Sequence, residues 1–370
     1  MSADLSVVIC SLNGAAGVDR CLRALADQKD VELQVIVVDD GSTDETSEVG
    51  REHGATVIRH EVNRGLAAAR NTGVAAATAP VVAFLDDDCE PAPEWARELL
   101  AGYDAGAVGV GGSVEPCAPD GFMLGYLQRN NPLLPLELDL AKSEKLAYRL
   151  YRYVLRQWQP EERDDRRDVY SLVGANMSFL RSALLETGFD ERFRFGAEDL
   201  DLCLRMPRDH PGGRLVVTPD AVVKHHFVPS LGDTLRRSRG YGRGCARLYR
   251  KWPSMRPTIY PGPVLVIAAL IAGCFFPPVF IAAVLLPQLM YPKGLRLAVT
   301  KRRPAAALDA YVQLAEEAFG NVGYIKGMWT FRHLVPEPST PAVTATAEAA
   351  RAAELAEPAG QASVGSSAWQ

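Results

Sequence analysis

The chain has 370 residues, a formal net charge of −5 and an isoelectric point near 5.8. This length accommodates one large domain or two ordinary ones, and the acidic balance argues against a general nucleic-acid binder, whose surface is basic. The seven cysteines are scattered without a CxxC pair, which suits a reducing compartment and offers no zinc site. The N-terminus carries Asp4 and only a short apolar run. We therefore expect no signal peptide and a cytosolic catalytic part.

The first 77 residues alternate short apolar runs with helical patterns. Strands are predicted over 5–10, 35–38 and 56–58, with an amphipathic helix after the first and an alanine-rich helix over 66–77. Strands and helices alternating at this spacing imply right-handed crossovers and a mainly parallel sheet. The sequence therefore predicts a doubly wound α/β domain.

A fourth apolar strand, over 81–85, ends in three carboxylates, Asp86, Asp87 and Asp88. Adjacent like charges at the end of a buried strand repel one another and lose solvation. A divalent cation held by carboxylate oxygens offsets that cost, and the carboxyl ends of strands in α/β sheets are where ligands bind. The alternative for this triplet is a solvated acidic turn.

Asp39 and Asp40 follow the second strand in the same way. Carboxylates at this place accept hydrogen bonds from a base or ribose, or hold a metal that bridges phosphates. Arg70, on the intervening helix, either faces the same crevice and contacts an anion or is a solvated helix charge. Neither GxGxxG nor GxxxxGK[ST] follows the first strand, which weakens the case for a classical dinucleotide enzyme or a P-loop NTPase.

Residues 120–170 read as an insertion with helical character and a mobile charged loop. Beyond it, Glu198, Asp199 and Asp201 begin a predicted helix, where the helix dipole favours anions. Three carboxylates are more than a helix cap needs, so we expect a catalytic role for at least one. A later strand ends at His225-His226, where a histidine serves either as a metal ligand or as a surface group.

These segments together resemble family 2 glycosyltransferases of the GT-A fold. The matching segments, in order, are 7–13 (VVICSLN), 37–44 (VVDDGSTD), 63–73 (NRGLAAARNTG), 84–88 (FLDDD), 174–177 (GANM) and 196–202 (GAEDLDL). The resemblance implies an inverting enzyme with a Rossmann-like mixed sheet over residues 1–232. It also implies a divalent cofactor, Mn²⁺ or Mg²⁺, and a nucleotide-diphosphate sugar as donor.

The resemblance assigns roles to individual side chains. Asp40, or its neighbour Asp39, would bind the nucleobase, and Arg70 would lie near the base or the diphosphate. In the D-x-D motif, Asp86 would lie near the ribose and the metal, and Asp88 would bind the metal directly. The implied sugar-nucleotide site comprises Cys10, Ser11, Asn13, Asp39, Asp40, Arg70, Asp86, Asp87 and Asn176. The implied metal ligands are Asp86, Asp88 and one of His225 and His226.

The implied chemistry is a single displacement. The sugar nucleotide leaves as a diphosphate whose developing charge a divalent ion stabilises. Asp199, beside Glu198, would accept the proton of the acceptor hydroxyl as that oxygen attacks the anomeric carbon, inverting its configuration. No Gln-x-x-Arg-Trp motif follows Asp199, which favours adding one or a few sugars over processive synthesis.

Two alternatives remain open at this point. A sugar-nucleotide nucleotidyltransferase would carry a glycine-rich basic loop after the first strand, but residues 11–16 (SLNGAA) contain no basic side chain. A non-catalytic module that binds sugar nucleotides would have no need for the Glu198-Asp199 pair.

The segment 235–256 is strongly basic, with aromatic residues interleaved. Phosphate contact or anionic-lipid binding explains it better than nucleic acid does, and a solvated basic helix is the alternative. The basic residues are Arg236, Arg237, Arg239, Arg243, Arg247, Arg250, Lys251 and Arg256.

Residues 263–290 carry no charge, and Pro277-Pro278 divides them into halves. Each half, as a helix of about 13 residues, is about 20 Å long, shorter than the ~30 Å hydrocarbon core of a bilayer. Basic residues flank both ends, which places both flanks in the cytosol. A re-entrant or interfacial hairpin satisfies both observations, whereas a single kinked span satisfies only the length.

We therefore expect 233–335 to be a helical region at the cytoplasmic face of the cell membrane and 336–370 to be a disordered tail. A membrane-bound acceptor such as a lipid-linked glycan is the hypothesis that this region motivates. It corresponds to a role in cell-envelope glycan, glycolipid or exopolysaccharide synthesis. The sequence does not distinguish UDP, GDP and dTDP as the donor nucleotide.

Overall fold

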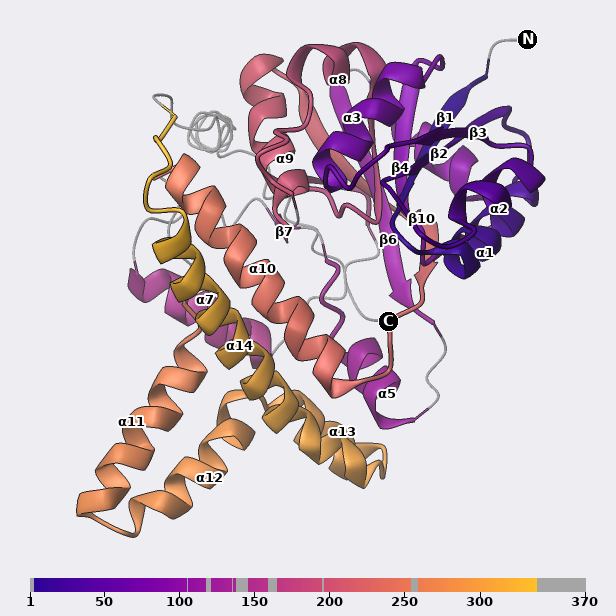
Figure 1. Cartoon of the computed structure of the whole chain (residues 1–370). Helices are drawn as coiled ribbons and strands as arrows, with labels where there is room; N and C mark the ends of the chain where they lie inside the picture. The colour runs from indigo at the N-terminus through magenta and orange to yellow at the C-terminus, as the bar shows by residue number, and fades with distance from the viewer. Residues whose placement is uncertain are drawn as a thin grey trace, which may run out of the picture.

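The protein is built on a mixed β-sheet, seen in a computed structural model (Figure 1) that describes residues 3–104, 106–117, 121–134, 136–137, 146–158, 165–194, 196–253 and 259–337. Its first part is parallel, in the order β3-β2-β1-β4. These strands are β1 (Leu5–Ser11), β2 (Leu33–Asp39), β3 (Thr56–Arg59) and β4 (Val81–Asp86). The predicted parallel start of the domain is confirmed.

The rest of the sheet mixes directions. β9 lies antiparallel between β4 and β6, and β10 runs parallel to β6. β8 and β7 continue that edge, and β5 pairs with the other end of β10. These strands are β5 (Cys89–Pro91), β6 (Ala107–Pro116), β7 (Leu136–Glu137), β8 (Arg167–Ser171), β9 (Asn176–Leu180) and β10 (Arg214–His225).

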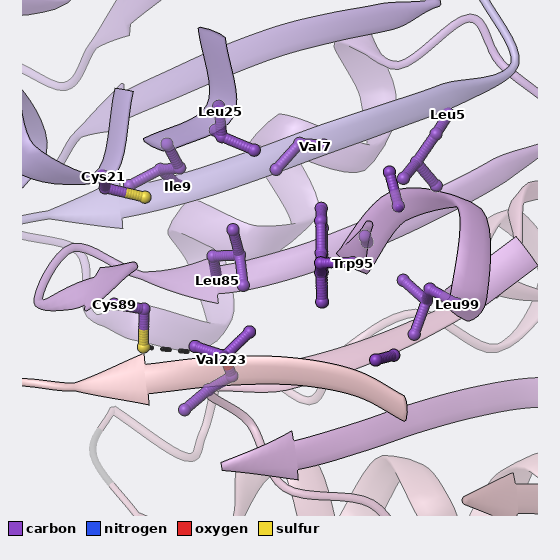
Figure 2. Close-up of a cluster of buried hydrophobic side chains, with 14 of the residues drawn as sticks. Leu5, Val7, Ile9, Cys21, Leu25, Leu85, Cys89, Trp95, Leu99 and Val223 are labelled. Carbon is purple, nitrogen blue, oxygen red and sulfur yellow. Dashed lines mark hydrogen bonds between the residues drawn. The ribbon is translucent and has the colours of Figure 1, made fainter. Parts of the chain in front are cut away.

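Helices cover both faces of the sheet and bury one apolar cluster on each. α1 (Ala15–Ala26) and α4 (Trp95–Ala101) pack on one face, where Trp95 and Leu99 are fully buried (Figure 2). α3 (Leu66–Ala76), α8 (Arg181–Thr187) and α9 (Glu198–Asp209) pack on the other. The predicted doubly wound arrangement is therefore confirmed. α2 (Thr46–Glu52), α5 (Phe122–Arg129) and α7 (Leu146–Trp158) complete this part of the chain.

Two long helices, α10 (Leu231–Lys251) and α14 (Asp309–Thr330), lie side by side below the sheet (Figure 1). Their backbones touch at glycines: a Cβ added at Gly242 would lie 2.0 Å from the carbonyl oxygen of Gly320. A Cβ at Gly323 would lie 2.1 Å from the carbonyl oxygen of Arg239. The glycines therefore set the close approach of the two helices.

The uncharged segment forms a two-helix hairpin, α11 (Pro261–Phe275) and α12 (Val279–Met290), that projects away from the sheet (Figure 1). The predicted break at Pro277-Pro278 is confirmed. Within the described ranges, no helix is both long and apolar enough to cross a membrane. α13 (Pro292–Thr300) and a 3₁₀ turn (Pro304–Leu308) lead into α14. Of the tail predicted to be disordered, 336–370, residues 338–370 lie outside the described residues, and Glu337 pairs with Arg192 at 3.1 Å. Of the predicted mobile charged loop, 161–168, residues 161–164 lie outside the described residues, whereas Arg167 and Asp168 belong to β8.

Candidate active site

The three carboxylates at the end of β4 rest against the start of α1. The Ser11 hydroxyl donates a hydrogen bond to Asp87 Oδ2 at 2.5 Å. A Cβ at Gly14 would lie 2.1 Å from Asp87 Oδ2, and a Cβ at Gly17 would lie 2.6 Å from the Asp87 carbonyl oxygen. Glycine at these two positions allows the acidic turn to sit this close to the helix. Ser11 and Asp87, both assigned to the implied sugar-nucleotide site, thus lie in contact, and their role in binding the nucleotide stays a prediction.

The structure separates the two candidate histidines. His225 Nε2 lies 3.2 Å from Asp88 Oδ1, and its ring stacks on Phe227 with 4.2 Å between centroids. The ring of His226 points elsewhere, with Nε2 2.6 Å from Glu90 Oε1, and only its backbone N–H contacts the Asp88 carbonyl. The expectation of a metal ligand therefore remains for His225. For His226 it is wrong, because its imidazole faces Glu90.

Burial shifts the pKa values of the three carboxylates of the acidic turn and of His225. Loss of solvent, with the charges of Asp86 and Asp87 added, raises the pKa of Asp88 to about 8. Burial raises the pKa of Asp87 to about 6 and also raises that of Asp86. Burial, together with the nearby charge of Arg237, lowers the pKa of His225 to about 3, so the imidazole is neutral. A nearby cation would favour the charged form of each carboxylate.

The donor set fits a hard divalent cation. Asp88 Oδ1 is buried and accepts no hydrogen bond in the described part of the chain, and the ring nitrogen that faces it, at 3.2 Å, is His225 Nε2. Carboxylate oxygens suit Mg²⁺ and Mn²⁺, and a neutral imidazole is a common metal ligand. One ligand atom from each of Asp88, Cys89 and His225 lies within 4.8 Å of the others. Cys89 does not complete the set, because its thiol donates to the Ala175 carbonyl at 3.7 Å and burial raises its pKa well above the usual value.

Arg70 connects the acidic turn to the start of α9. Its side chain is only 3% exposed, and Nη1 donates to Glu198 Oε1 at 2.9 Å. Nη2 lies 3.4 Å from Asp86 Oδ1 and 3.3 Å from the Gly174 carbonyl oxygen. The guanidinium also lies against the rings of Phe84 and Phe189. The alternative of a solvated helix charge is therefore wrong: Arg70 is a buried cation shared by two parts of the site.

Glu198 and Asp199 begin α9, as predicted, after Ala197 in the left-handed conformation with φ 67°. Asp199 accepts hydrogen bonds from the backbone N–H groups of Leu200 at 2.8 Å and Gly174 at 3.1 Å. Burial raises the pKa of Asp199, and burial with the charge of Asp199 raises that of Glu198 to about 7. Glu198 is buried and held by Arg70, whereas Asp199 is half-buried, and its predicted role as the base stays a prediction.

Asp201, one turn into the same helix, fastens α9 to α10. Its Oδ1 accepts from Trp252 Nε1 at 2.9 Å and lies 2.7 Å from Lys251 Nζ. Its Oδ2 accepts from Arg205 Nε at 2.8 Å. All of its contacts are structural, so among the three carboxylates of this segment Asp201 fixes the position of the other two.

The carboxylates after β2 organise their own loop. Asp39 is 0% exposed and accepts from the Ser42 N–H at 2.7 Å, and also from the Ser47 hydroxyl. Asp40 is 5% exposed and accepts from the N–H groups of Arg64 and Gly65 at 2.9 and 2.8 Å. A contact of either with a nucleobase stays a prediction.

Cys10 lies near the end of β1, and Asn13 lies in the loop that follows it. Cys10 pairs in register with Val38 of β2 and Asp86 of β4, and burial raises its thiol pKa to about 12. Asn13 is exposed, and its Oδ1 accepts from the Thr43 N–H at 2.8 Å. Asn13 thus connects the loops that follow β1 and β2, where the predicted nucleotide would lie. Contacts of Cys10 and Asn13 with the nucleotide stay predictions.

The structure contradicts the prediction that the Asn176 side chain belongs to the sugar-nucleotide site. The side chain is fully buried, and its Oδ1 accepts from Trp95 Nε1 at 2.9 Å. Its Nδ2 donates to the carbonyl oxygens of Ser113 and Ala221, both at 2.9 Å. Both amide hydrogens are therefore used to join β9 to β6 and β10. The Asn176 side chain therefore stabilises the sheet, and its amide group is used there and not for binding the sugar nucleotide.

A cleft of about 470 Å³ opens beside the acidic turn. Asp86, Asp88 and His225 line one side of it, and α10 with the end of α14 forms the other. Residues from these helices that line it include Arg237, Arg239, Tyr241, Arg243 and Lys326.

Arg237 and Tyr241 were not assigned to the site from the sequence. The Arg237 guanidinium lies over Phe227 at 4.7 Å, and its buried Nη2 has no hydrogen-bond partner among the described residues. Burial and the charges of Asp86, Asp199 and Glu198 raise the pKa of Tyr241. The i, i+4 spacing of Arg237 and Tyr241 marks them as one helix face, but not what that face meets.

Comparison with known proteins gives matches along most of the chain. Glycosyl transferase family 2 matches residues 6–186, and glycosyl transferase family group 2 matches residues 161–295. The chain is 32% identical over 274 residues to a pre-mycofactocin glycosyltransferase from Mycobacterium tuberculosis, covering 71% of this chain and 51% of that protein. It is 28% identical over 237 residues to a glucosyl-dolichyl phosphate glucuronosyltransferase from Haloferax volcanii, covering 60% and 68%.

Among solved structures, the mannosyltransferase PcManGT from Pyrobaculum calidifontis, in complex with GDP-Man and Mn²⁺, aligns with a TM-score of 0.50 at 18% identity. The alignment covers 89% of this chain and 88% of that one. The two proteins share a fold, which confirms the predicted class of mixed α/β sheet. The chain spans about half the length of the M. tuberculosis relative, with 51% of that protein covered.

Proposed function

Because the chain belongs to glycosyl transferase family 2, we propose that it transfers a sugar from a nucleoside-diphosphate sugar to a hydroxyl group of an acceptor. One observation carries the proposal. Arg70 joins Glu198, at the start of α9, to Asp86 of the acidic turn, and Asp86 and Asp88 line a large cleft. The carboxylates proposed to hold the metal and the carboxylate proposed as the general base are therefore linked through Arg70 and Glu198, and sugar transfer from a diphosphate requires both groups.

Asp199 is the general base in this proposal. Its two backbone hydrogen bonds fix the carboxylate at the start of α9, and its raised pKa increases its affinity for a proton. It would accept the proton of the acceptor hydroxyl as that oxygen forms its bond to the anomeric carbon. The bond to the diphosphate breaks in the same step, so the anomeric configuration inverts.

Asp86, Asp88 and His225 would hold the divalent cation. When bound, the cation would neutralise the charge that develops on the leaving diphosphate. Arg237, over Phe227 and with an unpartnered Nη2, adds a fixed positive charge on the opposite wall of the same cleft. The imidazole favours Mn²⁺ over Mg²⁺, because Mg²⁺ prefers oxygen ligands throughout.

A thermal-shift panel of UDP, GDP and dTDP with Mn²⁺ or Mg²⁺ tests the donor site, because a ligand that binds the native state raises its stability. We expect one nucleoside diphosphate to raise the melting temperature only when the metal is present, and EDTA to abolish the shift. Asp88→Asn should lose the metal-dependent shift, and Asp220→Asn, at an exposed position of β10, should keep it. If no nucleoside diphosphate shifts the wild type, the proposal fails.

We also propose that the enzyme works at the cytoplasmic face of the cell membrane, with α11 and α12 inserted in the interface. Large apolar side chains stand exposed along both helices, including Phe275 (87%), Phe276 (63%) and Ile281 (67%). Exposed apolar surface of this extent marks a membrane or protein contact. Basic residues precede and follow the hairpin, which supports the cytoplasmic side. The name of the H. volcanii relative, which refers to a dolichyl phosphate, supports a lipid-linked acceptor.

Flotation with phosphatidylcholine–phosphatidylglycerol vesicles tests this location. The full chain should float with the vesicles, and Phe275→Ser with Phe276→Ser should weaken the association severalfold. Val62→Ser with Leu185→Ser removes two exposed apolar side chains elsewhere and should leave flotation unchanged. A wild type that stays at the bottom of the gradient would refute the membrane proposal.

A further inference from the structure

The wall of the cleft formed by α10 and α14 carries a second group of cations, apart from Arg237. Arg239, Arg243 and Lys326 line the cleft, and all three residues are exposed. Across the described part of the chain, no carboxylate pairs with any of them, whereas the neighbouring Arg236 pairs with Asp233 at 3.0 Å. Unpaired like charges gathered on one wall repel one another, and a bound anion would remove that cost.

The packing of the two helices holds these three residues together. The backbone of Arg239 lies against Gly323, and the backbone of Arg243 lies against Gly327, one position beyond Lys326. Arg239 and Arg243 are one helical turn, about 6 Å, apart along α10. The glycine contacts leave no room for either helix to slide. These contacts fix the backbone positions of the three residues, whose exposed cationic side chains are defined here as the basic wall.

The basic wall lines the same cleft as the acidic turn and Arg237. Along α10, Arg237 is close enough to Asp88 for its charge to act on that carboxylate. Tyr241 is likewise within reach of the charges of Asp86 and Asp199. Gly244 follows against the backbone of Gly196, just before α9. On the proposed function the leaving diphosphate would lie near Asp88 and Arg237, which leaves the three exposed cations of the basic wall for a second anion.

We propose that the basic wall binds a phosphate group carried by the acceptor. The inference rests on the proposed sugar transfer and names the chemical class of its acceptor: a molecule with a free hydroxyl near Asp199 and a phosphate held by Arg239, Arg243 and Lys326. Arginine side chains bind phosphate oxygens through paired N–H donors, and a lysine adds a point charge. The phosphate belongs either to a lipid whose chains follow the hairpin or to a soluble phosphate ester.

Calorimetric titration of the full chain distinguishes these sources. The donor site is first filled with Mn²⁺ and the nucleoside diphosphate that the thermal-shift panel identifies. The probes are glycerol 3-phosphate, dihexanoyl phosphatidic acid and glycerol. We expect one or both phosphate probes to bind and glycerol not to bind. At least tenfold tighter binding of phosphatidic acid assigns the site to a lipid phosphate, and equal binding of the two phosphates assigns it to a soluble ester.

The variant Arg243→Gln with Lys326→Gln should weaken binding of the phosphate probe at least tenfold and leave affinity for the nucleoside diphosphate within threefold of wild type. Arg23→Gln with Lys29→Gln removes the same charges at exposed positions on and after α1 and should bind the probe as wild type does. A phosphate affinity that the first variant leaves unchanged, or no phosphate binding at all, would overturn the inference. The proposed sugar transfer would still stand if the nucleoside diphosphate binds.

Discussion

Replacing Arg70 with methionine should destabilise the fold by about 3–5 kcal/mol, the usual cost of removing one partner from a buried charge pair. Methionine keeps much of the apolar stem against Phe84 and Phe189 while removing the guanidinium. Glu198, whose side chain is 5% exposed, would lose its 2.9 Å partner and would either stay charged without a counter-ion or take up a proton as its pKa rises further, and both cost stability. Asp86 would lose a weaker contact at 3.4 Å, and at 35% exposure its side chain can be hydrated instead. The cost therefore falls mainly on Glu198.

A double-mutant cycle separates that cost from lost packing. Glu198→Gln keeps the shape of the side chain and removes its charge, so Arg70→Met combined with Glu198→Gln should recover about 1–3 kcal/mol relative to Arg70→Met alone. Urea unfolding at pH 7.5, followed by circular dichroism, gives each free energy of unfolding. The cost of Arg70→Met should also shrink at pH 5, because Glu198, with a pKa raised to about 7 by burial, is then protonated.

Arg64→Met is the matched control. Arg64 is 48% exposed and pairs at 3.3 Å with Glu191, which is 47% exposed, so its loss should cost no more than about 1 kcal/mol. An Arg70→Met cost as small as that of Arg64→Met would refute the reasoning. So would a double mutant no more stable than Arg70→Met.

Three further changes test other contacts. Asn176→Ala should cost about 2–5 kcal/mol in urea unfolding, because three buried partners lose hydrogen bonds, and the folded protein should bind nucleoside diphosphate as before. Glu317, held by Tyr153 and Tyr291 at 2.7 Å each, has a pKa raised by burial from 4.5 to about 7. Protonated Glu317 therefore adds up to about 3 kcal/mol to the free energy of unfolding below pH 4.5, and this contribution is lost as the pH rises through 7. Glu317→Gln should flatten this pH dependence. A variant with the same pH profile as the wild type would contradict the assignment. Gly242→Ala should cost about 1–3 kcal/mol, since its methyl would meet the Gly320 carbonyl oxygen, whereas Gly232→Ala, with open space around it in the same helix, should not destabilise.

The sequence predicted those features that depend on local pattern. Apolar runs identified β1 to β4, and the parallel order followed from their alternation with helices. The carboxylates of 86–88 and 198–199 were found because each group directly follows a strand or begins a helix. Two prolines identified the hairpin turn. In each case a few neighbouring residues determine the structure.

Features that depend on distant contacts were not predictable in this way. Successive residues of an extended chain point to opposite sides, so His225 and His226 could not both face Asp88, and only the pairing of β10 with β5 determines that His225 does. Asn176 belongs to a polar motif, and its burial depends on carbonyl groups of two strands far along the chain. Arg237 and Tyr241 enter the site only because glycine contacts dock α10 against α14 and the loop before α9.

The central claim is that Asp199 is the base of a glycosyl transfer, and Asp199→Asn tests it most directly. Asparagine preserves the size of the side chain and removes its capacity to take a proton. With the donor identified by the nucleotide panel and a lipid extract as acceptor, release of nucleoside diphosphate should fall about 10²–10⁴-fold. Affinity for the nucleoside diphosphate should stay within threefold, and Asp209→Asn, at the other end of α9, should turn over normally. Turnover of Asp199→Asn at the wild-type rate would contradict the account.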